Sequence, residues 1–158
     1  MSPVASDDSQ KTMGSPGVSG GDSSRPWLAL ASDYEQARAK QDSLDRLVEW
    51  PAQRKLLGDV AGRSVLDVGC GNGGKVAELV RDGATDCVGV DISGNFISDP
   101  LPGLELIQGD LSELESVPGL ARRRFDRILF LQTFGYAKDP GRTLQTAREM
   151  LTDEASSC

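Results

Sequence analysis

The chain has 158 residues, of which 38% are hydrophobic, and a formal net charge of −7 at pH 7. This length suits one domain rather than two. The acidic balance argues against nucleic acid as a partner, because a polyanion needs a basic surface. The absence of histidine removes imidazole as a general base, as a metal ligand and as a pH switch.

The three cysteines, Cys70, Cys87 and Cys158, show neither paired spacing nor the spacing of a metal site. We therefore expect no metal centre, and a reduced, cytoplasmic protein. No apolar run approaches transmembrane length, and the N-terminus lacks the layout of a signal peptide. No membrane partner is expected.

The N-terminal third is predicted to contain a tail and a helical cap. Residues 1–25 are rich in Ser, Gly, Asp and Pro, which predicts a disordered tail. Residues 26–62 are predicted to form helices, with Ser32 and Glu35 arranged as a capping box. Pro51 is placed to begin a second helix that Gly62 ends, and both helices are expected to pack at the edge of the first strand.

The stretch VLDVGCGNGGK, from Val65 to Lys75, organises the rest of the chain. Its apolar start predicts a buried strand over residues 64–68. Four glycines follow between Gly69 and Gly74, and they permit tight turning and close approach of a ligand. The next residues have helical spacing up to a stop at Gly83. Strand, glycine loop and helix are typical of the nucleotide-binding half of a Rossmann-like unit.

Three more strands are predicted, over residues 86–91, 104–108 and 125–131. Pro100 and Pro102 exclude a full crossover helix before the third strand, so one or two turns are expected at 95–98. A last helix is predicted to start near Asp139. Alternating strands and helices predict an α/β fold with a parallel sheet and right-handed crossovers, over residues 63–152, before a tail at 153–158. The apolar positions expected to face inward on the last helix are Leu144, Ala147, Met150 and Leu151.

Polar residues end the predicted strands, at the edge where parallel sheets bind ligands. The pattern G-x-G-x-x-G alone also fits a dinucleotide site, or plain turns. Asp67, however, lies two residues before Gly69, and a carboxylate there repels a pyrophosphate. It suits a cationic cofactor without phosphate, such as S-adenosylmethionine. The alternative for Asp67, Asp91 and Asp110 is that they cap helices.

Four motifs in order, VLDVGCGNG, VGVDIS, LELIQGDLSEL and FDRILFLQTFGYAKDP, resemble those of class I S-adenosylmethionine-dependent methyltransferases of the small-molecule group. The resemblance spans about Tyr34 to Leu151. It implies a Rossmann-like parallel sheet with helices on both faces, and four strands in the order 3-2-1-4 out of the family's seven. It also implies S-adenosylmethionine as cofactor and a small-molecule acceptor methylated on O, N or C.

The resemblance also implies where the cofactor lies. The loop would hold its methionine part, Asp91 its ribose hydroxyls and Asp110 its adenine amino group, while Tyr34 resembles a lid residue. The implied cofactor-binding set is Tyr34, Asp67, Val68, Gly69, Cys70, Gly71, Asn72, Gly73, Asp91, Ile92, Gly109, Asp110, Leu111, Phe130 and Leu131. Tyr136 and Asp139 are candidate bases for a hydroxyl acceptor, and an ordinary loop aromatic is the alternative for Tyr136.

After Leu151 the chain reads TDEASSC, where the family continues with further strands. We interpret the chain as a fragment; a frameshifted gene product and completion by a partner are the alternatives. The apolar fourth strand would then be an exposed edge, which leaves open a homo-oligomer formed through it. Two other functions stay open: a cofactor-binding remnant without turnover, and a fragment of an NAD(P)-binding Rossmann oxidoreductase. The alanine- and arginine-rich composition, with the stretch GDVAGRSVLDVG, suggests a bacterial source.

Overall fold

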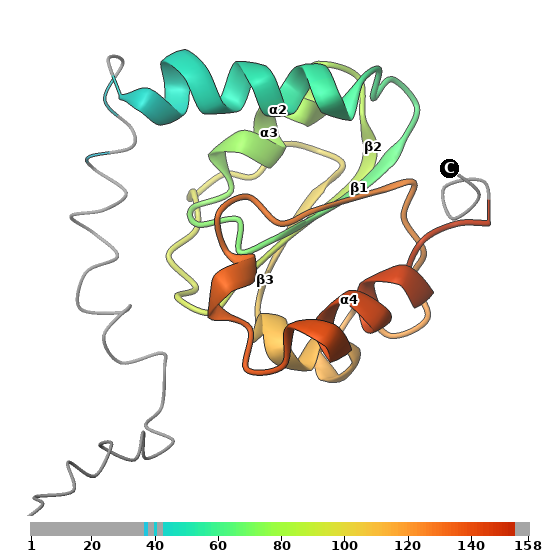
Figure 1. Cartoon of the computed structure of the whole chain (residues 1–158). Coiled ribbons are helices and arrows are strands. Elements are labelled where there is room, and N and C mark those ends of the chain that lie inside the picture. The colour runs from blue at the N-terminus through green and yellow to red at the C-terminus, as the bar shows by residue number, and fades with distance from the viewer. Residues whose placement is uncertain (1–36, 38–39, 41–42, 154–158) are drawn as a thin grey trace, which may run out of the picture.

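The computed structural model describes residues 37, 40 and 43–153. The predicted tail at 1–25, the capping pair Ser32 and Glu35, and the lid candidate Tyr34 lie outside the described residues. Within them, four parallel strands form one sheet between two helical layers (Figure 1). The order is β3-β2-β1-β4, which confirms the predicted topology. The strands are β1 (Ser64–Val68), β2 (Thr85–Asp91), β3 (Leu104–Gln108) and β4 (Arg127–Leu129).

The helices divide between the two faces of the sheet (Figure 1). One face carries the π-helical η1 (Asp45–Glu49), α2 (Trp50–Leu57) and α3 (Gly74–Arg81). The other carries the 3₁₀ helix η2 (Leu111–Ser116) and α4 (Pro140–Glu149), and a further 3₁₀ turn, η3 (Phe134–Tyr136), follows β4. A parallel sheet covered on both faces needs strands that are apolar on both sides.

The strands supply two hydrophobic clusters, one for each face. Val65 packs with Val76 and Leu79 of α3, whereas the next residue, Leu66, packs with Phe125 and other residues on the α4 face. All of these side chains are fully buried. The alternation follows from the two-residue period of a strand. It determines which side chains of each strand face the α3 layer and which face the α4 layer.

The N-terminal helices are attached to α3 by polar contacts. Lys75 Nζ lies 2.6 Å from Oδ1 of the buried Asp45, and Trp50 Nε1–H donates to Glu78 at 2.6 Å. Because Lys75 lies in the first turn of α3, directly after the glycine loop, this ion pair ties the N-terminal helices to the functional edge.

The helix predicted to begin at Pro51 is continuous with the one before it. The Trp50 N–H donates to Asp45 O, five residues back, so a π turn precedes the proline. A wider turn accommodates the proline ring, which would clash with a carbonyl in a regular helix. The helix then ends at Leu57 rather than near Gly62, because Gly58 adopts a φ of 72°.

Three other local predictions are wrong. No helical turn forms at residues 95–98, where the chain is irregular between Asp91 and Pro100. The fourth strand is ladder-paired only over 127–129. Ala147 and Met150 are buried as predicted, but Leu144 is 53% exposed, because Thr143 takes the inward position beside them.

Asp126 connects three segments at the end of the sheet where β1 and β4 begin, opposite the glycine loop. Its Oδ2 accepts from Ser64 N–H at 2.9 Å and from Ser64 Oγ–H at 3.1 Å, while Oδ1 accepts from Thr152 Oγ–H at 3.1 Å. The hydrogen bond from the Ser64 backbone lowers the pKa of Asp126 below its ordinary value, against a smaller opposing effect of burial. The carboxylate therefore joins the start of β1, the start of β4 and the segment after α4.

An Asp126→Asn variant should lower the free energy of unfolding at neutral pH by about 1–3 kcal/mol, because an amide cannot accept on both sides. The folded pKa is depressed, so the stabilisation by Asp126 is present above the unfolded pKa of about 3.9 and lost as pH falls through the folded pKa. Urea denaturation from about pH 7 to about pH 2 should show the difference between wild type and variant shrinking.

The matched control is Asp99→Asn, since Asp99 is exposed and accepts no hydrogen bond from the described residues. A difference for Asp126→Asn that is constant across the pH range would contradict the role of the charge.

Candidate functional site

The site lies where the four strands end, and hydrogen bonds draw these ends together. Gly69 N–H and Cys70 N–H both donate to Val90 O on β2, at 2.7 and 3.0 Å. Gly109 N–H, after β3, donates to Asp91 O at 3.0 Å. Thr133 Oγ–H, after β4, donates to Val68 O on β1 at 2.8 Å. The residues predicted from separate motifs thus share one edge of the sheet.

The glycine loop has a backbone that other residues adopt only with strain. Gly69, Gly71 and Gly73 have φ values of 77°, 57° and 88°. A Cβ on Gly69 would lie 2.2 Å from Thr133 Cγ2, and one on Gly73 would lie 2.7 Å from Leu106 Cδ2. The loop is therefore packed against its neighbours on the side of the sheet and presents bare backbone.

Asp67 is the buried acid of the edge. It occupies the centre of the sheet, paired in register with Gly89 on β2 and Leu129 on β4, and it is 1% exposed. Removing a carboxylate from water is costly. Asp67 lies one residue before the end of β1, and the glycine loop begins two residues after it.

Asp91 is bonded to the loop that it was predicted to serve. Its Oδ2 accepts from Gly71 N–H at 2.9 Å, and its Oδ1 accepts from Ser93 N–H and Oγ–H at 2.9 and 2.7 Å. A carboxylate has about four lone-pair sites, so three of them are used. The alternative role of a helix cap is not observed for Asp91, because no helix lies among the described residues between it and β3. Its bonds to the loop and to Ser93 fix the direction of the carboxylate.

Asp110 caps η2 and is also paired with a lysine. Its Oδ1 accepts from Ser112 N–H at 2.8 Å, and Lys138 Nζ lies 3.1 Å from Oδ2. Burial alone would raise the pKa of Asp110, but the hydrogen bonds from Ser112 and Lys138 outweigh it and lower the pKa below its ordinary value. Asp110 is therefore a carboxylate in a locally basic setting.

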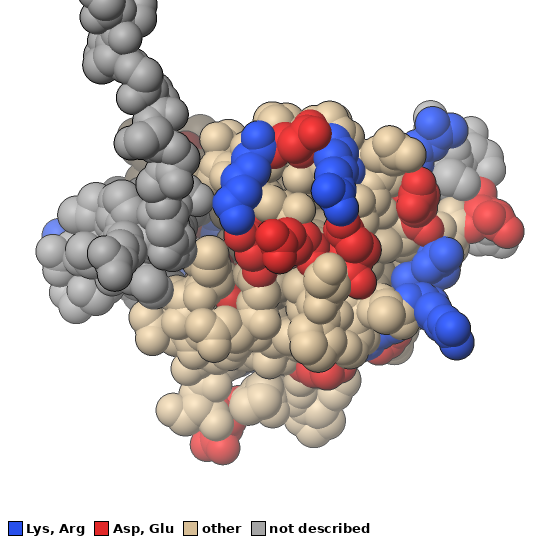
Figure 2. Space-filling model, turned by 90° about the horizontal axis from the view of Figure 1, so that it is seen from below, with Lys and Arg blue, Asp and Glu red and all other residues tan. Residues whose placement is uncertain are grey.

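The α4 side of this edge is rich in charges of both signs (Figure 2). Besides Lys138 and Asp110, Arg142 of α4 pairs with Glu115 of η2. Lys138 N–H also donates to Ser112 Oγ at 3.0 Å. The loop between β4 and α4 is therefore attached to the cap of η2 at several points.

The apolar residues predicted around the cofactor lie on both faces. Leu111 and Phe130 pack on the α4-side cluster, and Leu131 packs on the α3-side cluster. The carbonyl of the half-buried Ile92 accepts from Gln108 Nε2–H at 3.0 Å. Phe130 also meets Phe134 edge to face, at 5.6 Å between ring centroids. Phe130 and Leu131, which follow β4, thus pack on opposite faces of the sheet and do not line one side of a shared pocket.

The two candidate bases differ in what they already do. Asp139 Oδ1 accepts from Arg142 N–H at 3.0 Å and caps α4. Tyr136, at the end of η3, is 51% exposed. Both side chains are exposed, and the carboxylate of Asp139 is already engaged at the helix cap.

Sequence reasoning missed three residues that touch this site. Thr133 and Lys138 act through contacts with segments distant in sequence, and no local pattern marks them. Glu49 of η1 accepts a hydrogen bond from Gln132, which lies three residues after the end of β4. Glu49 carries no local signal either, because its partner is distant in sequence.

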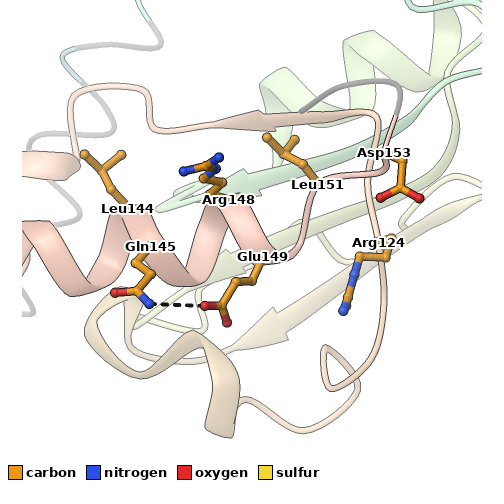
Figure 3. A pocket seen from close by; sticks show the side chains of 7 residues that line it. All are labelled: Arg124, Leu144, Gln145, Arg148, Glu149, Leu151 and Asp153. Atoms are coloured by element: carbon orange, nitrogen blue, oxygen red, sulfur yellow. Dashed lines mark hydrogen bonds between the residues drawn. The ribbon is translucent and has the colours of Figure 1, made fainter. Parts of the chain in front are cut away.

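A separate open groove of about 800 Å³ lies beside α4, away from the glycine loop (Figure 3). Leu144 and Arg148 point to one side of the helix, while Gln145 and Glu149 are hydrogen-bonded to each other on another. None of the predicted cofactor residues lines it. Its walls are Arg124, Leu144, Gln145, Arg148, Glu149, Leu151 and Asp153.

Residues 37, 40 and 43–153 contain no group of three or more His, Cys, Asp or Glu side chains placed to hold a metal ion. In the same part of the chain, no helix combines the length and apolar character needed to cross a membrane.

Comparison with known proteins gives consistent matches. A family model described as a methyltransferase domain matches residues 32–156. An uncharacterised protein of Haemophilus influenzae is 27% identical over 130 residues, which are 78% of this chain and 51% of the relative. A tRNA U34 carboxymethyltransferase of Aeromonas salmonicida is 30% identical over 114 residues, covering 67% of this chain and 34% of the relative.

Among solved structures, an S-adenosylmethionine-dependent methyltransferase from Mesorhizobium loti is similar with a TM-score of 0.61 and 29% identity. The match covers 70% of this chain and 51% of that one. The chain thus spans about half the length, or less, of these relatives.

The packing of the glycine loop can be tested with Gly69→Ala. The added Cβ would overlap Thr133 in a left-handed backbone, so the free energy of unfolding should fall by about 2–4 kcal/mol. Urea denaturation measures this. Gly135→Ala is the control, because its Cβ would meet no atom within 4 Å; equal stability of the two variants would refute the close packing.

Proposed function

The chain belongs to the methyltransferase domain family, and from this membership we propose that it binds S-adenosylmethionine and transfers the methyl group to a small-molecule acceptor. S-adenosylmethionine is the cofactor of the similar Mesorhizobium loti enzyme. The observation that carries the proposal is the pairing of the bare glycine turn with the buried Asp67 beneath it. That arrangement favours a cation and disfavours a diphosphate.

The residues at the edge fit such a cofactor. Three carboxylates, Asp67, Asp91 and Asp110, match an ammonium, a ribose diol and an adenine amino group, all of which are hydrogen-bond donors. Asp91 and Asp110 keep lone-pair sites beyond their bonds to the chain. The exposed backbone of the loop allows close approach of the amino-acid part.

We assign the remaining contacts as follows. Asp67, Val68, Gly69, Cys70, Gly71, Asn72 and Gly73 would hold the methionine part. Ile92 would lie against the adenine, with Gly109 and Leu111 beside it, and Phe130 and Leu131 would border the sulfonium.

Bound S-adenosylmethionine supplies the methyl group and its own thioether leaving group, so the chain's task is alignment and exclusion of water. The apolar Phe130 and Leu131 would exclude water at the end of β4. For a hydroxyl acceptor, the phenol of Tyr136 would accept or orient the proton. Asp139 is the weaker candidate, because its carboxylate already caps α4.

The alternatives differ in what they bind. A cofactor-binding protein without turnover would bind S-adenosylmethionine but transfer no methyl group. An NAD(P)-binding oxidoreductase would prefer a dinucleotide, against which Asp67 argues. The acidic net charge leaves a small molecule, rather than nucleic acid, as the proposed acceptor.

We further propose that a second copy pairs on the β4 side of the molecule. Phe125 N–H donates to Met150 O on the outer edge, and Asp126 N–H donates inward to Ser64 O. Backbone N–H and C=O groups alternate in direction along a strand, so those of Arg127 point outward. No further described strand pairs with β4 on that side. The adjacent groove carries both charges, and Arg148 forms no ion pair with described residues. A two-fold axis would set Arg148 of one copy against Glu149 of the other.

Isothermal calorimetry with S-adenosylmethionine and NAD in parallel tests the cofactor. We expect binding of the first and not the second, and an Asp91→Asn variant should bind about tenfold or more weakly, because it loses a charged acceptor. Asp99→Asn is the control and should bind like wild type. Preference for NAD, or unchanged affinity in Asp91→Asn, would overturn the assignment.

Analytical ultracentrifugation tests the association of copies. Arg148→Glu and Glu149→Arg should each yield monomers, because each places like charges opposite one another, while the double variant should dimerise like wild type. Arg81→Glu, the same change on the opposite helical layer, is the control. A wild-type chain that is monomeric into the micromolar range would refute this pairing.

A further inference from the structure

We propose that Thr133 positions the glycine turn for the amino-acid half of the cofactor, and that the strained Gln132 serves to place it there. The inference rests on the proposed function and deepens it. No motif assigns a role to Thr133. It belongs to the turn between β4 and η3, which is far in sequence from the glycine loop.

The first observation is that Thr133 is hydrogen-bonded to the peptide that joins Val68 to Gly69, where the turn begins. Its Oγ–H donates to Val68 O at 2.8 Å, and the Gly69 N–H of the same peptide donates to Val90 O at 2.7 Å. Because a trans peptide points its C=O and N–H in opposite directions, these bonds hold one planar unit from both sides. The orientation of that unit sets where the turn begins.

The second observation is the packing of the threonine side chain. A Cβ on Gly69 would lie 2.2 Å from Thr133 Cγ2 and 2.6 Å from its Cβ. The side chain therefore occupies the space that a Cβ on Gly69 would need. Movement of the turn towards Thr133 would cause a steric clash, and movement away would break the hydrogen bond.

The third observation is the backbone of Gln132. Its φ is 61°, in the left-handed region that non-glycine residues avoid. Such strain persists only where the surroundings maintain it, and it gathers at functional sites. Here the left-handed residue bends the chain three residues after β4, and its side chain donates to Glu49 of η1. The bend is what turns Thr133 back over Gly69.

These contacts connect Thr133 to one half of the ligand only. Under the proposed function the glycine turn receives the methionine part, whereas Asp91 and Asp110 receive the ribose and adenine. Loss of the Thr133 hydroxyl should loosen the turn and leave the nucleoside end unaffected. A threonine that served stability alone would weaken both halves equally or neither.

The test compares S-adenosylhomocysteine, which has the amino-acid part, with methylthioadenosine, which lacks it, by calorimetry. Thr133→Val keeps the shape and removes the donor, so affinity for S-adenosylhomocysteine should fall about tenfold while affinity for methylthioadenosine stays unchanged. Thr133→Ser, which keeps the hydroxyl, should retain most of the affinity. Thr146→Val, the same change on α4, is the control and should alter neither.

A second variant tests the strained residue. Gln132→Val puts a β-branched side chain at a left-handed position, which such residues adopt only at a high cost, so the bend should relax. Affinity for S-adenosylhomocysteine should then fall while affinity for methylthioadenosine stays unchanged, because Thr133 is no longer held over Gly69. Gln132→Gly is the control and should bind both ligands like wild type, because glycine adopts a positive φ freely and keeps the bend.

The outcomes separate the two levels of the argument. A wild-type chain that binds neither ligand would refute the proposed function. Wild-type binding that Thr133→Val leaves unchanged, or weakens equally for both ligands, would refute the inference alone, as would unchanged affinity in Gln132→Val.

Discussion

The functional edge depends on a close approach of backbones that side chains would prevent. Gly69 lies beneath Thr133, and Gly73 lies against Leu106. Gly89 plays the same part from within β2, since a Cβ there would meet Cys70 Sγ at 2.7 Å. The loop is thus fitted against β2, β3 and the turn after β4 at once. This contact, more than any single hydrogen bond, explains why the strand ends converge on one site.

Features encoded by local pattern could be predicted from the sequence. β1 and β3 were predicted with the observed bounds, because apolar runs between turn residues are sufficient to define a buried strand. Asp139 caps α4 as expected from an acid before a proline. The strand order, which the resemblance to the methyltransferase family implied, is also observed. The meeting of Asp67, Asp91 and Asp110 at one edge follows from a parallel sheet, whose strands all end on the same side.

Features that depend on distant partners could not be predicted in this way. Pro51 indicated a new helix, but a π turn before it lets the helix continue. Leu144 has the periodicity of a core residue, yet the rotation of α4 is set by Thr143 and Ala147. Thr133 has no signal of its own, because its role comes from a contact with Gly69 across the sheet.

The hydrogen bonds that Asp91 and Asp110 make to the chain are compatible with the binding roles proposed for them. A carboxylate accepts about four hydrogen bonds, and the chain uses three at Asp91 and two at Asp110. The bonds from Gly71 and Ser112 fix the plane of each carboxylate, so the remaining lone pairs have a defined direction before any ligand arrives. Binding of a ligand then costs little conformational entropy at these side chains. A carboxylate held by the chain in this way is therefore better prepared to bind a ligand than a free one, and such bonds do not argue against a functional site.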